Sequence, residues 1–147
     1  MYHNDIPSLP LYSILRNYIY LMDKQPNILI AEDDRIISID LKKSLTELGY
    51  NVYDPVASGI EIVNMALSLK PDVILMDIKL AGNVDGIDAA KTIQLNTSIP
   101  IIFLTAYGTE KAYKKVKHIS SYKIIQKPFN ISDIDNAIKE ALHLNGK

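Results

Sequence analysis

Short apolar runs that alternate with helical apolar stripes constrain this 147-residue chain more than any other feature. The runs lie at Asn27–Ala31, Val73–Met76, Ile101–Leu104 and Tyr122–Ile125. Runs this short, with little polar alternation, are typical of strands that are covered on both faces. Because strands alternating with helices form βαβ units, the pattern predicts an α/β domain with a parallel sheet.

Apolar residues at helical spacing follow each run, and a further strand is predicted between the first two stripes. The stripes are Ile37, Leu41, Leu45 and Leu48, ended by Gly49; Ile60, Val63 and Leu67; Ile87, Ala90 and Ile93; Ala112, Val116 and Ile119; and Ile134, Ile138 and Leu142. Ser132 and Asp135 have capping-box spacing at the start of the last helix. The further strand, Asn51–Ala57, contains Pro55, which cannot donate to a ladder, so we predict it at an edge.

These elements predict a doubly wound, flavodoxin-like domain. Its sheet has five parallel strands in the order 2-1-3-4-5, with five helices around it. In such sheets ligands bind outside the carboxyl ends of the strands. Residues at those ends are therefore the candidate site.

Composition excludes several classes of function. The formal net charge is −1, which gives no electrostatic reason to bind nucleic acid or an anionic membrane. The chain has no cysteine, so disulfides, thiolate metal sites and thiol nucleophiles are excluded. The apolar stretch Leu11–Met22 is interrupted by Arg16 and Asn17 and is too short to span a bilayer. We expect a cytoplasmic protein without a membrane or nucleic-acid partner.

Residues 1–26 differ in character from the rest and are predicted to be an extension of a domain over residues 27–144. They contain three of the seven prolines, Pro7, Pro10 and Pro26. Two interpretations remain open. Either the extension has little structure, or it forms a short helix that docks on the domain or on a partner. The second interpretation rests on apolar residues at helical spacing: Leu11, Ile14, Leu15, Tyr18, Ile19 and Met22.

Acidic side chains gather at the ends of the first and third predicted strands. Glu32, Asp33 and Asp34 follow the first strand, and Asp77 follows the third. Carboxylates that converge from two strands repel one another unless a cation lies among them. Oxygen ligands without His or Cys suit a hard divalent ion, and Mg²⁺ is the usual partner of phosphate chemistry, with Mn²⁺ as the alternative.

Thr105 and Lys127 follow the fourth and fifth strands and add donors for an anion. A metal, a carboxylate, a lysine and a hydroxyl together fit phosphoryl transfer onto an aspartate. Thr105 or Lys127 alone is more often an ordinary strand-end or turn residue, the acidic run alone favours neither interpretation, and Asp77 at the end of an apolar strand is more indicative of function. Their occurrence together, each at the end of its own strand, favours the functional interpretation.

Four segments in order resemble the receiver domain of bacterial and archaeal response regulators: Ile28–Asp34, Val73–Ile78, Ile102–Ala106 and Lys127–Phe129. The resemblance covers about Asn27 to Leu144. It implies that Asp77 accepts a phosphoryl group from a phosphohistidine. It also implies that Mg²⁺ is held by Asp77, Glu32, Asp33 and the backbone carbonyl of Lys79.

The resemblance assigns roles to the donors as well. Thr105 matches the hydroxyl that turns toward the phosphoryl group, and Ala106 the small residue beside it whose backbone approaches the anion. Lys127 matches the lysine that pairs with phosphoryl oxygens, and its bond to Pro128 is predicted to be cis. Asp34 is assigned at most a supporting role.

The sequence departs from the family at the switch position, three residues before the lysine. This position is usually aromatic, and here it is Ile124. Tyr122 lies two residues earlier and, by strand alternation, on the same face. We predict that Ile124 or Tyr122 changes its burial on activation.

Because no DNA-binding domain follows Leu144 in this sequence, we expect a stand-alone, non-enzymatic signalling protein whose output is protein contact. The expected partners are a sensor histidine kinase or phosphotransfer protein and a downstream protein, and the expected state is a monomer or a phosphorylation-dependent homodimer. The main alternative is a receiver-like binding module that acts without phosphorylation. A haloacid-dehalogenase-like phosphatase would need an aspartate at position 79, where this chain has Lys79.

Overall fold

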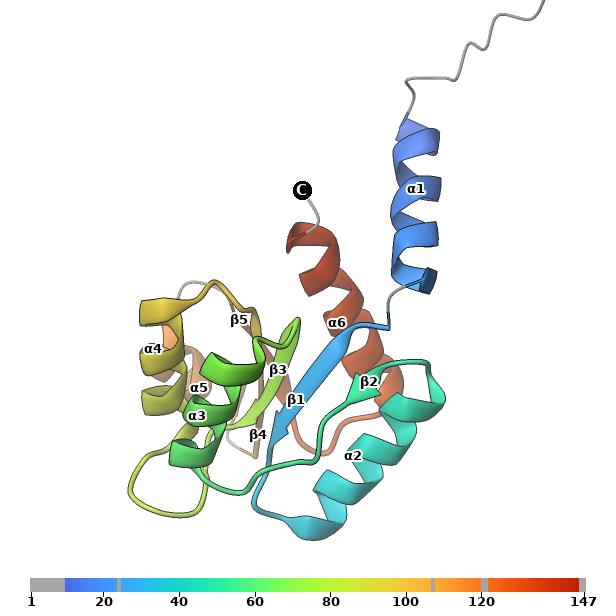
Figure 1. Cartoon of the computed structure of the whole chain (residues 1–147). Coiled ribbons are helices and arrows are strands. Elements are labelled where there is room, and N and C mark those ends of the chain that lie inside the picture. Colours follow the sequence, from blue (N-terminus) through green and yellow to red (C-terminus); the bar gives the residue numbers. More distant parts are fainter. Residues whose placement is uncertain (1–9, 24, 107, 120–121, 146–147) are drawn as a thin grey trace, which may run out of the picture.

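The computed structural model describes residues 10–23, 25–106, 108–119 and 122–145, and contains one parallel sheet (Figure 1). The strand order is β2-β1-β3-β4-β5, which confirms the predicted order. The strands are β1 (Asn27–Ala31), β2 (Asn51–Val52), β3 (Val73–Asp77), β4 (Ile101–Thr105) and β5 (Tyr122–Gln126).

Helices cover both faces of the sheet, so each face has its own apolar core. The helices α2 (Arg35–Glu47) and α6 (Ile131–Asn145) pack on one face. The other face carries α3 (Gly59–Leu69), α4 (Gly86–Asn96) and α5 (Thr109–Val116). Strand residues alternate between the two cores, as Ile28 and Leu29 do. The central strands β3 and β4 are buried at every residue, as their apolar sequences predict.

The second strand is shorter than predicted, although its edge position is confirmed. It ends at Val52 rather than at Ala57. The chain leaves the ladder at Asp54 and Pro55 and returns at Val56, whose N–H donates to the Ile30 carbonyl at 2.9 Å. Because Pro55 has no N–H to donate, the continuous strand predicted here was wrong.

Two further details of the helices correct the sequence analysis. The predicted cap of α6 is replaced by Asn130, whose side-chain oxygen accepts the Asp133 N–H at 3.1 Å and the Ser132 hydroxyl at 2.7 Å. At the end of α2, Leu48 was predicted to belong to the apolar stripe. It lies beyond the helix and is 50% exposed, next to Gly49 at a φ of +100°.

Tyr50, which directly precedes the edge strand β2, is hydrogen-bonded to α6 on the face of the sheet that α2 and α6 cover. Its side chain is buried, and its hydroxyl donates to Asp135 Oδ1 at 2.5 Å. Asp135 also pairs with Lys139 one turn along α6, at 2.9 Å. Burial, together with the adjacent Asp135 carboxylate, raises the pKa of Tyr50 well above its usual range, so the hydroxyl remains a donor.

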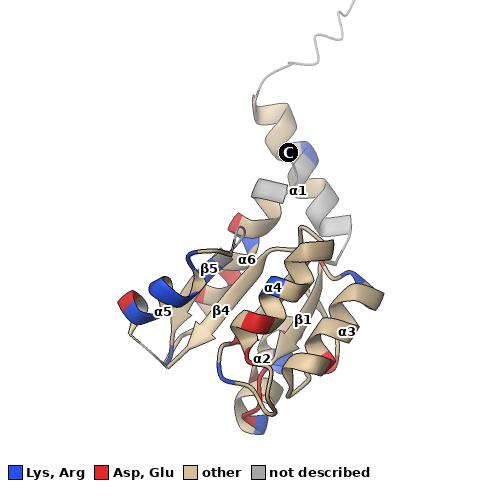
Figure 2. Cartoon of the chain, turned by 90° about the vertical axis from the view of Figure 1, so that its left-hand side faces the viewer, with Lys and Arg blue, Asp and Glu red and all other residues tan. Residues whose placement is uncertain are grey.

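The extension contains a sixth helix, α1 (Pro10–Asp23), in addition to the five predicted. It covers the predicted apolar stripe and extends away from the domain at the amino end of β1 (Figures 1 and 2). Residues 1–9 lie outside the described part of the chain. Among the described residues, no helix has the length and apolar character needed to cross a lipid bilayer.

Substitution Tyr50→Phe is expected to lower the free energy of unfolding by about 1–2 kcal/mol, because the buried hydroxyl bond to a carboxylate is lost. Urea denaturation followed by circular dichroism measures this loss. Tyr53→Phe is the matched control, since the described residues offer the half-buried Tyr53 hydroxyl no hydrogen-bond partner. Equal losses in both variants would show that the Tyr50–Asp135 bond does not stabilise the fold.

Candidate functional site

The structure brings three of the predicted carboxylates together at the carboxyl end of the sheet. Glu32 and Asp33 follow β1, and Asp77 is the last residue of β3, the neighbouring strand. Parallel register places the ends of these strands side by side, with Ala31 opposite Met76. As a result, one oxygen from each of Glu32, Asp33 and Asp77 lies within 4.8 Å of the others, close enough for a shared cation.

Lys127 bridges two of these carboxylates from the end of β5. Its Nζ lies 2.5 Å from Glu32 Oε1 and 3.0 Å from Asp77 Oδ2. The side chains of Glu32, Asp77 and Lys127 are 0%, 9% and 18% exposed. Charges this far removed from water require partners, because an unpaired buried charge is strongly destabilising. Lys127 thus neutralises part of the negative charge of Glu32 and Asp77.

The titration of the cluster reflects both burial and crowding of like charge. Burial raises the pKa of Glu32 from its usual 4.5 to about 7, and the adjacent Asp77 adds to the rise. For Lys127, burial lowers the pKa, but its bonds to Glu32 and Asp77 outweigh burial and keep the pKa above the usual value. Glu32 is therefore partly protonated near neutral pH, and a divalent cation bound there would displace this proton.

The backbone orients the Asp77 carboxylate as well. The Lys79 N–H donates to Asp77 Oδ1 at 3.1 Å, while Oδ2 faces Lys127. Both carboxylate oxygens are therefore held in a fixed direction. The Lys79 side chain is exposed, and the role of its carbonyl as a metal ligand stays a prediction.

Asp34, the third acid of the run, serves α2 instead of the acidic cluster. Its side chain caps the helix by accepting the N–H groups of Ile36 and Ile37 at 3.0 and 3.2 Å. Its own N–H donates to Glu32 Oε2 at 3.2 Å. One residue thereby starts the helix and fixes the second oxygen of Glu32.

The donors predicted from β4 and β5 lie at the adjacent strand ends. Thr105 is the last residue of β4 and is 1% exposed, and Ala106 beyond it is exposed. The Lys127 N–H donates to the Thr105 carbonyl at 2.7 Å, which joins the ends of β4 and β5. The Lys127–Pro128 bond is cis, as predicted.

The switch position is part of the apolar core. Ile124 is 8% exposed and belongs to the cluster that contains Ala112 and Val116 of α5. Through its backbone, Tyr122 pairs with Ile101 at the start of β5, but its side chain lies outside the described residues.

Two glycines shape the site and were not identified from the sequence. A Cβ on Gly86 would lie 2.1 Å from the Asp77 carbonyl oxygen, and one on Gly59 would lie 2.3 Å from that of Val84. Glycine therefore lets the first turns of α4 and α3 approach the end of β3 and the loop after it. For Gly86, the sequence did contain a local indication: it directly follows Asp85, whose side chain caps α4.

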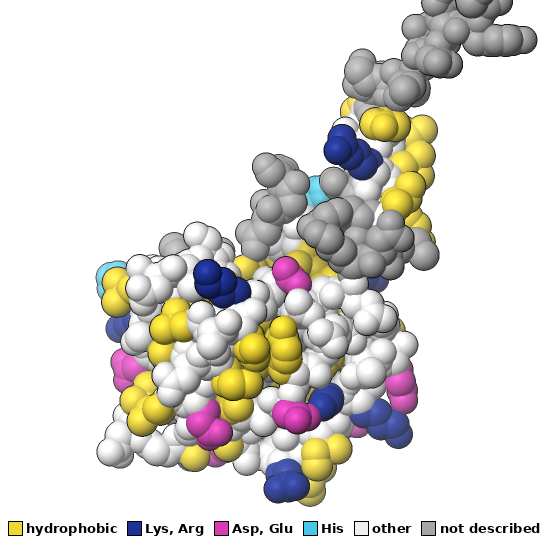
Figure 3. Space-filling view, viewed as in Figure 1, with side chains coloured by type: hydrophobic (Ala, Val, Ile, Leu, Met, Phe, Trp, Pro, Cys, Tyr) yellow, Lys and Arg dark blue, Asp and Glu magenta, His cyan; other side chains and the backbone are white. Residues whose placement is uncertain are grey.

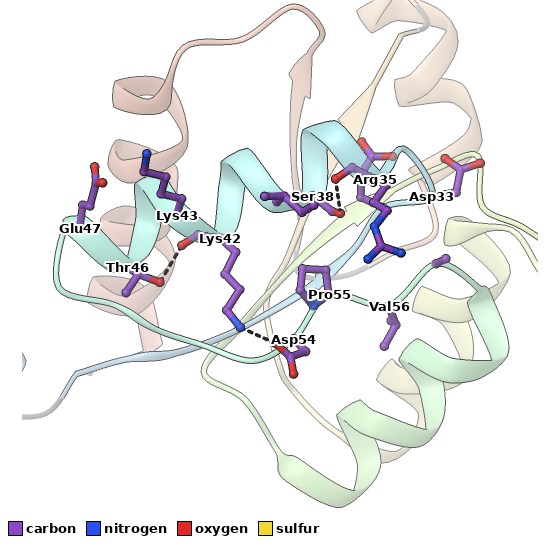
Figure 4. Close-up of a pocket in the computed structure, with 13 residues that line it drawn as sticks. Asp33, Arg35, Ser38, Lys42, Lys43, Thr46, Glu47, Asp54, Pro55 and Val56 are labelled. Atoms are coloured by element: carbon purple, nitrogen blue, oxygen red, sulfur yellow. Dashed lines mark hydrogen bonds and ion pairs between the residues drawn. The ribbon is translucent and has the colours of Figure 1, made fainter.

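An open groove runs from the acidic cluster along α2 (Figure 4). Glu32 and Asp33 line it, and its opposite wall is the segment 54–57. Lys42 reaches across from α2 and forms an ion pair with Asp54 (Figure 4). The cluster therefore opens to the surface beside Asp33, which is exposed.

The sequence matches the profile of the response regulator receiver domain over residues 28–139. The chain belongs to this family. Among curated relatives, the transcriptional regulatory protein PdtaR of Mycobacterium tuberculosis is 37% identical over 115 residues, which is 78% of this chain and 56% of PdtaR. The chain thus spans little more than half the length of that relative. Sporulation initiation phosphotransferase F of Bacillus subtilis is 31% identical over 80% of this chain and 94% of its own length.

A solved receiver domain with a bound ion has the same fold. It is the receiver domain of the sensor histidine kinase PA1611 from Pseudomonas aeruginosa PAO1, described with a magnesium ion coordinated in its active-site cleft. Its TM-score to this receiver domain is 0.74 at 28% identity, over 82% of this chain and 99% of that one. The family membership and the flavodoxin-like order predicted from sequence are therefore confirmed.

Substitution Gly86→Ala is expected to lower the free energy of unfolding by about 1–3 kcal/mol, because the new methyl group meets the backbone of Asp77. Chemical denaturation gives this change. Gly108→Ala is the matched control, since a Cβ at Gly108 has no atom within 4 Å. If Gly86→Ala is no more destabilising than Gly108→Ala, the close approach of α4 to β3 is wrong.

The raised pKa of Glu32 predicts a specific pH dependence of stability without divalent ions. The folded protein binds this proton more tightly than the unfolded chain, whose pKa is near 4.5. The contribution of Glu32 is therefore fully present below about pH 4.5 and is lost as pH rises through about 7. In the presence of a chelator, the urea midpoint of the wild type should fall across this range relative to that of Glu32→Gln. Parallel curves for the two proteins would contradict the assignment.

Proposed function

We propose that this receiver domain accepts a phosphoryl group on Asp77 from a phosphohistidine of a sensor histidine kinase or phosphotransfer protein. The observation that carries the proposal is the Asp77 carboxylate itself. It lies at the end of a buried strand, 3.0 Å from Lys127 Nζ and beside Glu32 and Asp33. Phosphoryl transfer onto a carboxylate requires a nucleophile, a cation and acids that can hold a metal ion. Here these parts are Asp77, Lys127, and Glu32 with Asp33.

In the proposed transfer, an oxygen of Asp77 attacks phosphorus as the phosphorus–nitrogen bond of the phosphohistidine breaks. The products are an acyl phosphate on Asp77 and a free imidazole on the donor. The new group brings roughly two negative charges to the site. Lys127 already contacts Asp77 and needs only to turn its ammonium group toward the incoming oxygens.

The donor set also fits a hard divalent cation. We assign Mg²⁺, with Mn²⁺ as the alternative, to Glu32, Asp33, Asp77 and the Lys79 carbonyl. The ion would neutralise charge on the phosphoryl oxygens. Support comes from the clustered carboxylates and from the magnesium ion in the PA1611 receiver domain. Glu32 would release its proton as the ion binds.

The same proposal extends to the switch and the output. Thr105 would turn toward the phosphoryl oxygens, with Ala106 offering its backbone N–H. The change would reach α5 and Ile124, which belong to one apolar cluster together with Phe103, the β4 residue that pairs with Ile124. We assign the output to protein contact by a receiver acting alone. The match to nearly the whole length of sporulation initiation phosphotransferase F supports this role in a phosphorelay.

Incubation with Mg²⁺ and acetyl phosphate, followed by intact-mass measurement, tests the proposal. One phosphoryl group should be gained, and the gain should disappear with chelator because the crowded carboxylates need the ion. Asp77→Asn should abolish the gain. Asp40→Asn, an exposed aspartate on α2, is the matched control and should retain it.

Labelling that persists in Asp77→Asn would place the nucleophile elsewhere. A wild-type protein that neither gains mass nor binds Mg²⁺ would instead favour the constitutive binding module. In that case the aliphatic Ile124 would be the first residue to replace, by Tyr, to ask whether the switch can be restored.

A further inference from the structure

The helix α1 has little means of stabilising itself. It is 14 residues long, a length at which helices without tertiary packing are marginal in water. Its first turn has no acidic residue and its last turn has no basic residue, so the helix dipole is not compensated. Its sequence, PLYSILRNYIYLMD, also contains β-branched and aromatic residues with modest helix propensity. A helix of this kind requires a surface to pack on.

One side of α1 carries a continuous apolar stripe that the domain leaves exposed. Leu11, Ile14, Leu15, Tyr18 and Ile19 have exposed fractions between 50% and 61%. Figure 3 shows hydrophobic side chains gathered along one edge of the described part of the helix. Large apolar side chains gathered on one face indicate an interaction site, whereas single exposed ones do not.

Charge decides between the possible occupants of the stripe. The α1 sequence contains one basic residue, Arg16, and one acidic residue, Asp23. Helices that lie on anionic membranes carry several Lys or Arg on their polar face, which α1 lacks. A highly charged protein or nucleic acid would likewise find no complementary charge (Figure 2). The occupant must itself be an apolar, nearly uncharged surface.

A second copy of α1 meets this requirement. Leu11, Ile14 and Tyr18 follow the three- and four-residue spacing of a coiled-coil seam, which Leu15 and Ile19 widen. Such a stripe is complementary to itself across a two-fold axis. Arg16 and Asp23 are seven residues apart and fall outside this seam, so pairing brings no like charges together at its centre.

The area available is sufficient for a dimer. Five apolar side chains that each lose roughly 100 Å² of accessible surface remove about 500 Å² per copy. Two copies together then bury about 1,000 Å², which is about the minimum area for a proposed protein interface and fits a dimer of moderate affinity.

We propose that α1 pairs stripe to stripe with α1 of a second copy, giving a dimer that does not depend on phosphorylation. The helix precedes the amino end of β1, whereas the acidic cluster lies beyond its carboxyl end (Figure 1). A dimer formed through α1 leaves Asp77 and Lys127 open to a phosphoryl donor in each copy. The proposal is independent of whether Asp77 is phosphorylated.

Sedimentation equilibrium of the full chain over micromolar concentrations tests the pairing. The wild type and Asp77→Asn should both give twice the 16.5 kDa chain mass, without phosphodonor. The double substitution Ile14→Ala with Tyr18→Ala removes the seam and keeps helix propensity, because alanine is the best helix former. It should weaken dimerisation about a hundredfold or more. Ser13→Ala, on the polar side, is the matched control and should leave dimerisation unchanged.

Several outcomes would overturn the pairing. The pairing is wrong if the wild type stays monomeric or if the double variant still dimerises. It is also wrong if Ser13→Ala weakens dimerisation as much as the double substitution does. If a dimer forms only with beryllofluoride, the interface lies on the activated receiver domain and not on α1. If the protein is monomeric and sediments with phosphatidylglycerol vesicles, α1 binds a lipid surface instead of a second copy. An unchanged thermal midpoint of the receiver domain confirms that each variant is folded.

Discussion

The ion pairs of Lys127 with Glu32 and Asp77 are the constraint on which the rest of the structure depends. Two carboxylates with side chains less than a tenth exposed lie within reach of one ammonium group. Without a cation, the acids would repel one another and would have to take up protons. Burial raises the pKa of Glu32, and the adjacent Asp77 adds to the rise, although the bond to Lys127 acts in the opposite direction. The site thus has the charge distribution to attract a divalent cation.

Backbone geometry sets the positions of these charges. The parallel register of β1, β3, β4 and β5 delivers the acids, Thr105 and Lys127 to one edge of the sheet. Gly86 lets α4 approach the backbone of Asp77, and Asp34 both starts α2 and fixes an oxygen of Glu32. Because these supports are backbone atoms and helix starts, they hold the carboxylates in position without a bound ligand.

The sequence predicted the sheet, its order and the clustered side chains, because buried parallel strands have a distinctive apolar pattern and their ends share one edge. The sequence-based predictions were wrong where two local patterns compete. Strand β2 ends before Pro55, and the side chain of Asn130 caps α6 in place of the capping box predicted from Ser132 and Asp135. The roles of Gly86 and Gly59 depend on helix-to-strand distances, and the partnership of Tyr50 with Asp135 spans 85 residues. Such long-range contacts have no local pattern. For α1, the apolar stripe left two interpretations open, and the structure shows a helix on which Leu11, Ile14, Leu15, Tyr18 and Ile19 are exposed.

The central claim is that Glu32, Asp33, Asp77 and Lys127 form one cation and phosphoryl site. Backbone amide NMR of the full chain, titrated first with Mg²⁺ and then with beryllofluoride, tests it most directly. We expect Mg²⁺ to shift the amides of residues 32–34 and 77–80, and beryllofluoride to extend the shifts to residues 105, 106 and 127. Shifts confined to other parts of the chain, or no saturable response to either addition, would contradict the claim.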